Sequence, residues 1–130
     1  MSTRVRLTFN PDKQGILSAN QGSSQIGDQP GALAPYDLIL GGLGGCLNHT
    51  LQTILDKKRI SAEHISYSIE GIKRDAQPAT LRDVYIETTI VNPDAGRDAL
   101  EKAFDAATRY CSVYQTLAKV ASMHPKLIVK

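Results

Sequence analysis

The segment that most constrains the fold is residues 35–59, PYDLILGGLGGCLNHTLQTILDKKR, in which leucines at helical spacing run through a cluster of glycines. Pro35 suits the first position of a helix, and Asp37 places a negative charge in the first turn, where it complements the helix dipole. A broad apolar stripe follows at helical spacing, formed by Leu40, Leu43, Leu47, Leu51, Ile54 and Leu55. The pattern predicts a helix from Pro35 to about Lys58, buried at the centre of a domain or an oligomer.

Four glycines occupy five positions of this predicted helix: Gly41, Gly42, Gly44 and Gly45. Each glycine inside a helix costs about 1 kcal/mol relative to alanine. The G-x-x-x-G spacing of Gly41 and Gly45 would let a second backbone approach closely, because no side chains stand between the two. We therefore expect a partner helix against this surface, supplied by the same chain or by a second copy.

The rest of the chain alternates between strands and helices. Period-two alternation predicts strands at 3–10, 64–72 and 81–91, a weaker return strand at Ile16–Leu17, and a polar loop at 18–34 with room for one short strand near Gln25–Ile26. Asn92-Pro93-Asp94 predicts the start of a helix that ends near Cys111. Ser112 and Gln115 have capping-box spacing, which predicts a second helix to about Ser122, followed by a strand at 127–129. This order indicates an α+β fold in a single domain, residues 1–130.

Composition argues against several classes of protein. The net charge is +2 with both signs interspersed, and the chain lacks tryptophan, so neither an electrostatic footprint nor a stacking platform for nucleic acid is present. No apolar run reaches the ~18 residues that span a bilayer, and no signal peptide is recognisable. We expect a cytoplasmic protein without membrane or nucleic-acid partners.

The two cysteines, Cys46 and Cys111, are the main candidates for chemistry. In a cytoplasmic protein, thiols are more often free, metal-bound or redox-active than joined in a structural disulfide. Cys111 falls at a predicted helix start, where backbone amides stabilise a thiolate, whereas Cys46 lies three turns into a helix and needs donors from elsewhere. Three alternatives stay open from the residues alone: two buried core cysteines, a metal site begun by Cys46 and His49, and a nucleophile pair formed by these same two side chains.

Two separated motifs resemble those of the OsmC/Ohr family of thiol-dependent peroxide-reducing proteins. The first is Pro35-Tyr36-Asp37-Leu38 followed by Leu43-Gly44-Gly45-Cys46, and the second is Cys111-Ser112-Val113-Tyr114-Gln115-Thr116-Leu117. The resemblance implies an intertwined homodimer in which two central helices pack at the core. It further implies that Cys46 is the peroxidatic thiol and Cys111 the resolving thiol, with no cofactor and no metal, an apolar organic hydroperoxide as substrate, and an external dithiol as reductant.

This chain differs from better-studied family members in two places. Those members carry a glutamate ten residues before the first cysteine, where this chain has Tyr36; the neighbouring Asp37 is the acidic residue expected to contribute to catalysis. They also use an arginine from the N-terminal hairpin, where the turn here offers Lys13, with Arg4 and Arg6 on the preceding strand. The sequence thus predicts Cys46, Cys111 and Asp37 as catalytic residues. The alternative is a non-catalytic member that binds a small molecule or lipid.

Overall fold

The computed structural model describes residues 1–130, which divide into two units, Met1–Ile39 and Leu40–Lys130. Helix α1 (Pro35–Lys57) begins in the first unit and continues through the second. Mixed helices and sheets confirm the predicted α+β class, and the element order is also as predicted, apart from one additional strand. The prediction of a single domain stays a prediction.

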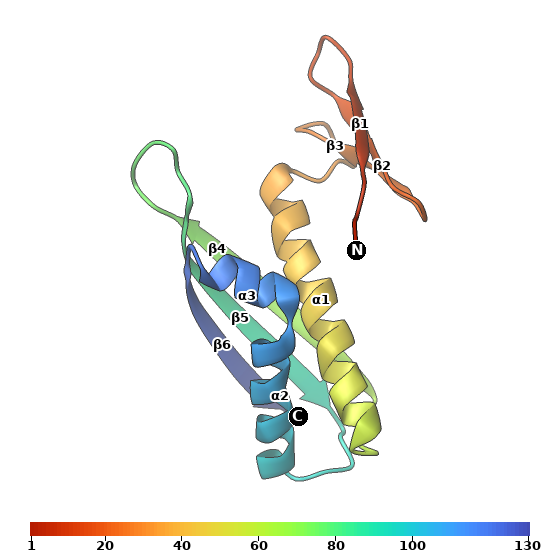
Figure 1. The fold of residues 1–130 in the computed structure, drawn as a ribbon, viewed down its shortest axis with the longest axis vertical. Helices are drawn as coiled ribbons and strands as arrows, with labels where there is room; N and C mark the ends of the chain where they lie inside the picture. Colours follow the sequence, from red (N-terminus) through yellow and green to blue (C-terminus); the bar gives the residue numbers. More distant parts are fainter. The chain divides into compact units, whose positions relative to one another are not determined.

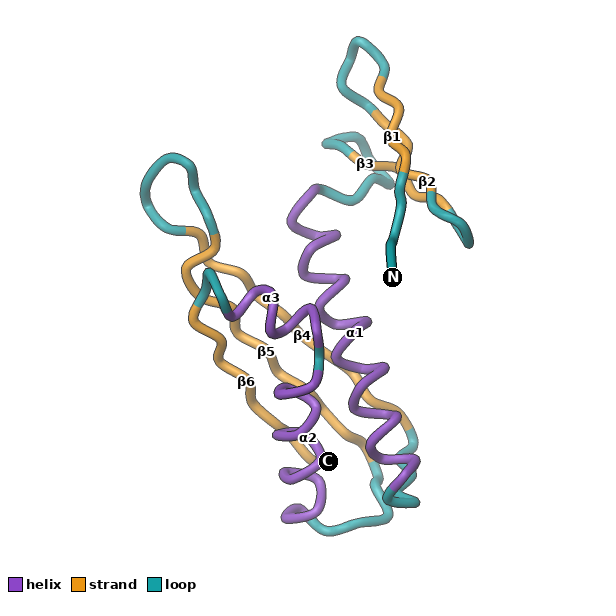
Figure 2. Tube along the Cα trace, in the orientation of Figure 1, coloured by secondary structure: helices purple, strands orange, loops and turns teal.

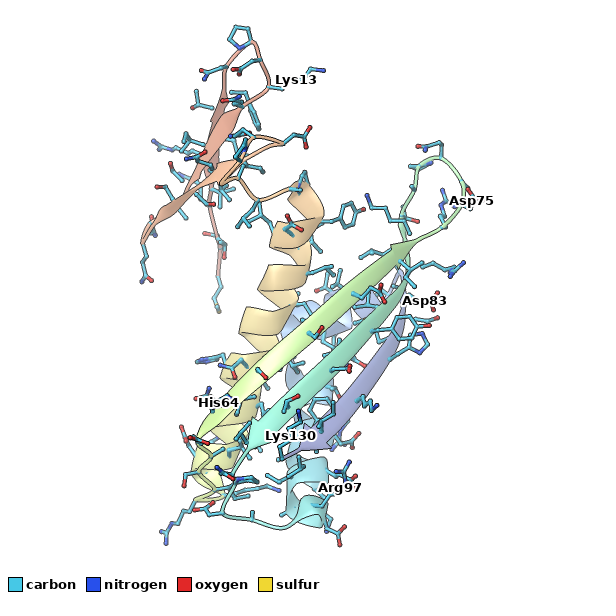
Figure 3. All side chains as sticks on the ribbon, turned by 180° about the vertical axis from the view of Figure 1, so that it is seen from behind. Lys13, His64, Asp75, Asp83, Arg97 and Lys130 are labelled. Atoms are coloured by element: carbon cyan, nitrogen blue, oxygen red, sulfur yellow. The ribbon has the colours of Figure 1, made fainter.

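The first unit is built on a three-stranded antiparallel sheet in the order β1-β2-β3. Its strands are β1 (Arg6–Phe9), β2 (Gly15–Ser18) and β3 (Ser23–Ile26). The predicted N-terminal hairpin is present, and the short strand near Gln25–Ile26 extends it to a third strand. Lys13 lies in the turn between β1 and β2 with a positive φ of 70°, and it is labelled at the tip of that turn in Figure 3.

The second unit packs helices on one face of another three-stranded sheet. Strands β4 (His64–Lys73) and β5 (Leu81–Val91) are antiparallel, and β6 (Ser122–Val129) lies parallel to β5 along the other side. A parallel neighbour requires a crossover, which α2 (Arg97–Tyr110) and α3 (Ser112–Ala118) provide. Figures 1 and 2 show both of these helices and α1 on the same side of the β4-β5-β6 sheet.

The core of the second unit lies between this sheet and the helices. One residue per turn of α1 is buried, and alternate residues of β5 face the same layer. The main buried side chains are Leu43, Leu47, Leu51, Leu55, Val84, Ile86, Ile90, Leu100, Ala103, Phe104, Ala107 and Leu127. Both periodicities are visible in the sequence, because each element buries only one face.

The glycines of α1 do not all have the same surroundings. A Cβ added at Gly44 would lie 3.2 Å from the Ile69 Cδ1 atom of β4, so this glycine does allow a close approach. A Cβ added at Gly41, Gly42 or Gly45 would meet nothing within 4 Å. The neighbour of Gly44 is thus a strand side chain and not a helix, and the partner helix expected against Gly41 and Gly45 stays a prediction.

Several element boundaries differ from the sequence prediction. Strand β1 covers only Arg6–Phe9 of the predicted 3–10, so Arg4 lies outside it. Helix α2 begins at Arg97 rather than at Asn92-Pro93-Asp94, because the Asp94 carboxylate accepts hydrogen bonds from the backbone N–H and hydroxyl of Ser61 (2.8 and 2.9 Å) and is unavailable as a cap. Helix α3 ends at Ala118 instead of about Ser122. Strand β6 starts at Ser122 rather than near 127, since Pro125 is tolerated in an edge strand.

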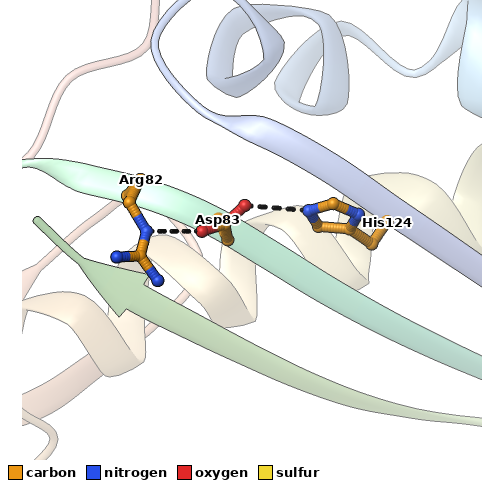
Figure 4. Close-up of polar contacts among 3 residues, drawn as sticks. All are labelled: Arg82, Asp83 and His124. Atoms are coloured by element: carbon orange, nitrogen blue, oxygen red, sulfur yellow. Dashed lines mark hydrogen bonds and ion pairs between the residues drawn. The ribbon is translucent and has the colours of Figure 1, made fainter.

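A polar cluster connects β5 and β6 on the sheet. The Asp83 carboxylate accepts a hydrogen bond from Arg82 Nε (2.6 Å) and lies 2.9 Å from His124 Nε2, as Figure 4 shows. The His124 ring also stacks on Tyr85, with centroids 4.4 Å apart. These bonds, first that with His124 and then that with Arg82, hold the pKa of Asp83 below its ordinary value. The cluster reinforces the parallel strand pair at its exposed edge.

No helix in the chain is both long enough and apolar enough to cross a membrane.

Candidate active site

Helix α1 places Cys46 at the edge of its buried stripe. The side chains of Leu43 and Leu47 are fully buried, and Cys46 precedes Leu47 by one residue, or about 100° around the helix. This offset leaves the Cys46 thiol partly exposed, as a free cysteine. The thiol is therefore fixed by the packed leucines and remains accessible to a small molecule.

Cys111 forms the junction between α2 and α3. It has an extended conformation (φ −75°, ψ 114°), and its backbone N–H bonds to the Ala107 carbonyl, which closes the end of α2. Its sulfur accepts a hydrogen bond from the Tyr114 N–H at 3.4 Å, which caps the start of α3. Cys111 is fully buried, so one residue ends a helix, begins another and presents a thiol inside the unit.

The predicted capping box of Ser112 and Gln115 is wrong. The N-cap of α3 is Cys111, because its extended backbone turns the sulfur toward the amide that a serine oxygen would normally cap. The Gln115 side chain donates instead to the Thr108 carbonyl at 3.0 Å and ties α3 back to α2. The Ser112 side chain is consequently left for another partner.

The structure brings the two thiols into one cluster. Cys46 Sγ lies 3.7 Å from Ser112 Oγ, and Cys46 also receives hydrogen bonds from the Cys111 thiol and from the backbone N–H groups of Val113 and Ser112. Cys46, in the middle of α1, and Cys111, which caps α3, are 65 residues apart in sequence (111 − 46 = 65) but are neighbours in the structure. The Cys46 sulfur therefore lies beside both Cys111 and Ser112.

The pKa values of the two thiols are shifted in opposite directions. Burial raises the pKa of Cys46, but the hydrogen bonds from the Val113 amide, the Cys111 thiol and Ser112 outweigh it, so the net pKa is lowered. Burial is also the main cause at Cys111, and the neighbouring Cys46 adds to it, which raises the pKa of Cys111 to about 11. The hydrogen bonds therefore favour the thiolate form of Cys46, whereas Cys111 stays protonated at neutral pH.

No cation of the second unit contributes to the lowered pKa of Cys46. The groups that lower the pKa of Cys46 are backbone amides, a thiol and a hydroxyl, and none is a lysine or arginine of Leu40–Lys130. The imidazole of His49 is exposed and makes no hydrogen bond to Cys46. Thiolate stabilisation in this unit thus comes from neutral donors.

Tyr67 is a further side chain close to the thiols that the sequence did not single out. Its hydroxyl donates to the Asn48 side-chain oxygen at 3.1 Å, two residues after Cys46. Burial, and then the charge that Cys111 would carry, raise the pKa of Tyr67, so the phenol stays protonated. It is a fixed polar group in the lining of the thiol cluster.

The remaining predicted residues lie in the first unit. Asp37 accepts a hydrogen bond from the Ala34 backbone N–H at 2.9 Å, which gives it a role in starting α1; its catalytic role stays a prediction. Arg4 and Arg6 border a surface hollow of about 400 Å³ together with Ser18, Ala19 and Asn20. The chain contains no group of three or more histidine, cysteine, aspartate or glutamate side chains placed to hold a metal ion.

Comparison with protein families decides the family. The model for the OsmC-like protein family matches residues 27–124, a span that includes both cysteines. The chain belongs to the OsmC-like family. No curated protein matches this member.

Solved structures confirm the fold. A hypothetical protein from Aquifex aeolicus is 24% identical with a TM-score of 0.91, covering 100% of this chain and 97% of its own. An OsmC-like protein from Mycoplasma pneumoniae is 15% identical with a TM-score of 0.90, covering 99% and 97%. An organic hydroperoxide resistance protein OsmC from Legionella pneumophila is 14% identical with a TM-score of 0.77, covering 99% and 98%. At these identities the similarity shows a shared fold.

The opposite pKa shifts predict selective alkylation of the native, reduced protein. At pH 7 iodoacetamide should modify Cys46 and leave Cys111 intact, because a thiol of pKa about 11 is a thiolate in only about one molecule in ten thousand at that pH. Peptide mapping after timed quenching measures each site. In urea-unfolded protein the two should react alike, and equal rates in the native protein would contradict the assignment.

Proposed function

We propose that this OsmC-like protein is a thiol-dependent peroxidase that reduces organic hydroperoxides through Cys46 and Cys111, with a role in defence against oxidative stress. The observation that carries the proposal is the proximity of Cys46, whose pKa is lowered, to the buried Cys111, whose pKa is raised. The similarity to a protein named for organic hydroperoxide resistance supports the same chemistry.

In the first step, the Cys46 thiolate attacks the terminal oxygen of the hydroperoxide. The O–O bond breaks, the alcohol leaves after taking up a proton, and Cys46 becomes a sulfenic acid. The electron pair comes from sulfur, so no metal or organic cofactor is needed. The hydrogen bonds that lower the pKa of Cys46 increase the fraction of thiolate available for this attack.

In the second step, Cys111 resolves the sulfenic acid. Its sulfur attacks the Cys46 sulfur, the S–O bond breaks, and water leaves with the thiol proton as the disulfide forms. A raised pKa keeps Cys111 protonated until Cys46 has been oxidised, which prevents it from competing for peroxide. An external dithiol then reduces the disulfide and restores both thiols.

We further propose that the working form is a homodimer. Apolar side chains of the first unit are about half exposed, including Val5 (48%), Leu7 (46%) and Phe9 (53%) of the N-terminal segment. In the second unit, Gly41 and Gly45 leave open space on α1. A second copy would cover the apolar strand residues and place its own helix against the glycines.

Peroxide consumption tests the catalytic proposal. The reduced protein should consume cumene hydroperoxide or tert-butyl hydroperoxide with a dithiol present, and Cys46→Ser should fall to the rate of buffer alone. Without the dithiol, wild type and Cys111→Ser should each consume about one equivalent, but the variant should keep a sulfenic acid that dimedone labels, because it lacks a resolving thiol in the same cluster. A Cys46→Ser variant as fast as wild type would contradict the proposal.

The same assay distinguishes a peroxidase from the non-catalytic alternative. A small-molecule or lipid-binding protein would leave the hydroperoxide unconsumed at neutral pH and would carry a stoichiometric ligand in native mass spectrometry. That combined outcome would replace the peroxidase proposal.

The dimer proposal predicts the effect of placing a large side chain at Gly45 of α1. Wild type should sediment at twice the chain mass of 14.1 kDa, and Gly45→Leu should sediment as a monomer with lower thermal stability. On a bare helix, replacing glycine would instead raise stability, by about 1 kcal/mol for alanine. Lys102→Leu, on the exposed side of α2, is the matched control and should leave the mass unchanged. A stable monomer in the wild type, or a more stable and still dimeric Gly45→Leu variant, would contradict the proposal.

A further inference from the structure

Ser112 is the side chain closest to Cys46 that neither the predicted site nor the two-cysteine chemistry uses. Its Oγ lies 3.7 Å from Cys46 Sγ. Its backbone carbonyl accepts from the Thr116 hydroxyl at 2.8 Å, but its own hydroxyl has no other hydrogen-bond partner in the chain. The position of Ser112 is fixed, because it follows Cys111, whose backbone and sulfur bond to α2 and α3.

The direction of this hydrogen bond follows from the state of the sulfur. A thiolate can only accept, so the Ser112 O–H must donate to it. A hydroxyl is a stronger donor than the thiol of Cys111, and hydrogen bonds to ionised groups are stronger than those between neutral groups. Since no cation of the second unit lowers the pKa of Cys46, the neutral donors carry the stabilisation there.

We propose that Ser112 is a catalytic residue whose hydroxyl donates first to the Cys46 thiolate and then, after oxidation, to the sulfenate oxygen. The second role rests on the proposed peroxidase function. In that step the Cys111 sulfur attacks Cys46, the Cys46 S–O bond breaks, and the oxygen leaves as water. A donor beside this oxygen assists its departure, and Ser112 is adjacent in sequence to the attacking thiol.

In this proposal, Cys111 and Ser112 both act on the sulfur of Cys46, each in a different way. Cys111 provides the nucleophile that forms the disulfide. Ser112 donates a hydrogen bond to the Cys46 thiolate before oxidation and to the departing oxygen while the disulfide forms. Both reach Cys46 because the α2–α3 junction has an extended residue at Cys111 followed immediately by helix. Burial of Cys111 and exposure of Ser112 fit these roles, since only the second must meet the reacting oxygen.

The first test measures the ionisation of Cys46 without any peroxide. The rate of iodoacetamide modification at Cys46 is followed by peptide mapping from pH 5 to pH 10 in the reduced, full-length protein. Ser112→Ala should raise the midpoint by about one pH unit, the size expected for losing one hydrogen bond to a charged group. Ser112→Thr, which keeps a hydroxyl, should stay near wild type.

Thr116→Val is the matched control on the same helix, because that hydroxyl bonds to the Ser112 carbonyl and not to sulfur. It should leave the midpoint unchanged. Circular dichroism verifies that each variant is folded, and Ser112→Thr keeps the test decisive if the alanine variant does not fold. A midpoint equal to wild type in folded Ser112→Ala, or one raised equally in the threonine variant, would overturn the proposal.

The second test addresses the sulfenate. After one equivalent of cumene hydroperoxide, dimedone competes with Cys111 for the sulfenic acid. Slower resolution in Ser112→Ala should increase the dimedone adduct at Cys46 several-fold at the expense of the disulfide. An unchanged partition would overturn the second role of Ser112.

The two tests separate this inference from the proposed function. If wild type fails to consume peroxide while Ser112→Ala still raises the alkylation midpoint, the thiolate role of Ser112 stands and the peroxidase proposal falls. If peroxide is consumed but midpoint and partition are the same in both proteins, the peroxidase proposal stands and the Ser112 proposal falls.

Discussion

The contact between Cys46 and the start of α3 is the interaction on which the chemistry of this structure depends. Leu43 and Leu47 anchor the middle of α1 in the core, which fixes the Cys46 sulfur. The junction at Cys111 brings two amides, a thiol and a hydroxyl to that sulfur. A small rotation of α1 or an extra residue between α2 and α3 would separate these groups, because each is held by the packing of its own element.

Burial and hydrogen bonding together distinguish the two thiols. Removal from water raises the pKa of both, and Cys111, which is fully buried, has only the Tyr114 and Val113 amides to offset this. Cys46 has more donors, and one of them is Cys111 itself. The same contact that favours charge on Cys46 therefore opposes it on Cys111.

Much of the fold can be predicted from the sequence, because most elements bury one face only. The leucine spacing of α1 and the alternation of β5 by themselves identify the residues that form the core. Element boundaries are harder to predict, since they depend on distant partners. Asp94 resembles a helix start, yet its carboxylate bonds to Ser61. Strand β6 begins at Ser122, earlier than the apolar run 127–129 indicates, because an edge position tolerates Pro125.

The sequence predicts that the two cysteines act together, but it does not predict which groups donate hydrogen bonds to Cys46. The motifs around Cys46 and Cys111 indicate the pair, but the roles of their neighbours follow from backbone geometry. Spacing alone assigns Ser112 and Gln115 to a capping box, whereas the sulfur of Cys111 occupies the capping position and frees the serine hydroxyl for Cys46. The serine that directly follows Cys111 in the sequence is the signal that could have indicated this donor.

The proposed chemistry requires that Cys46 and Cys111 of the same chain react with each other. The most direct measurement is the intact mass of the reduced protein after one equivalent of cumene hydroperoxide. We expect a loss of two hydrogens per chain and a tryptic peptide pair joined through Cys46 and Cys111. An unchanged mass would contradict the claim, as would a disulfide that joins two Cys46 residues from different chains.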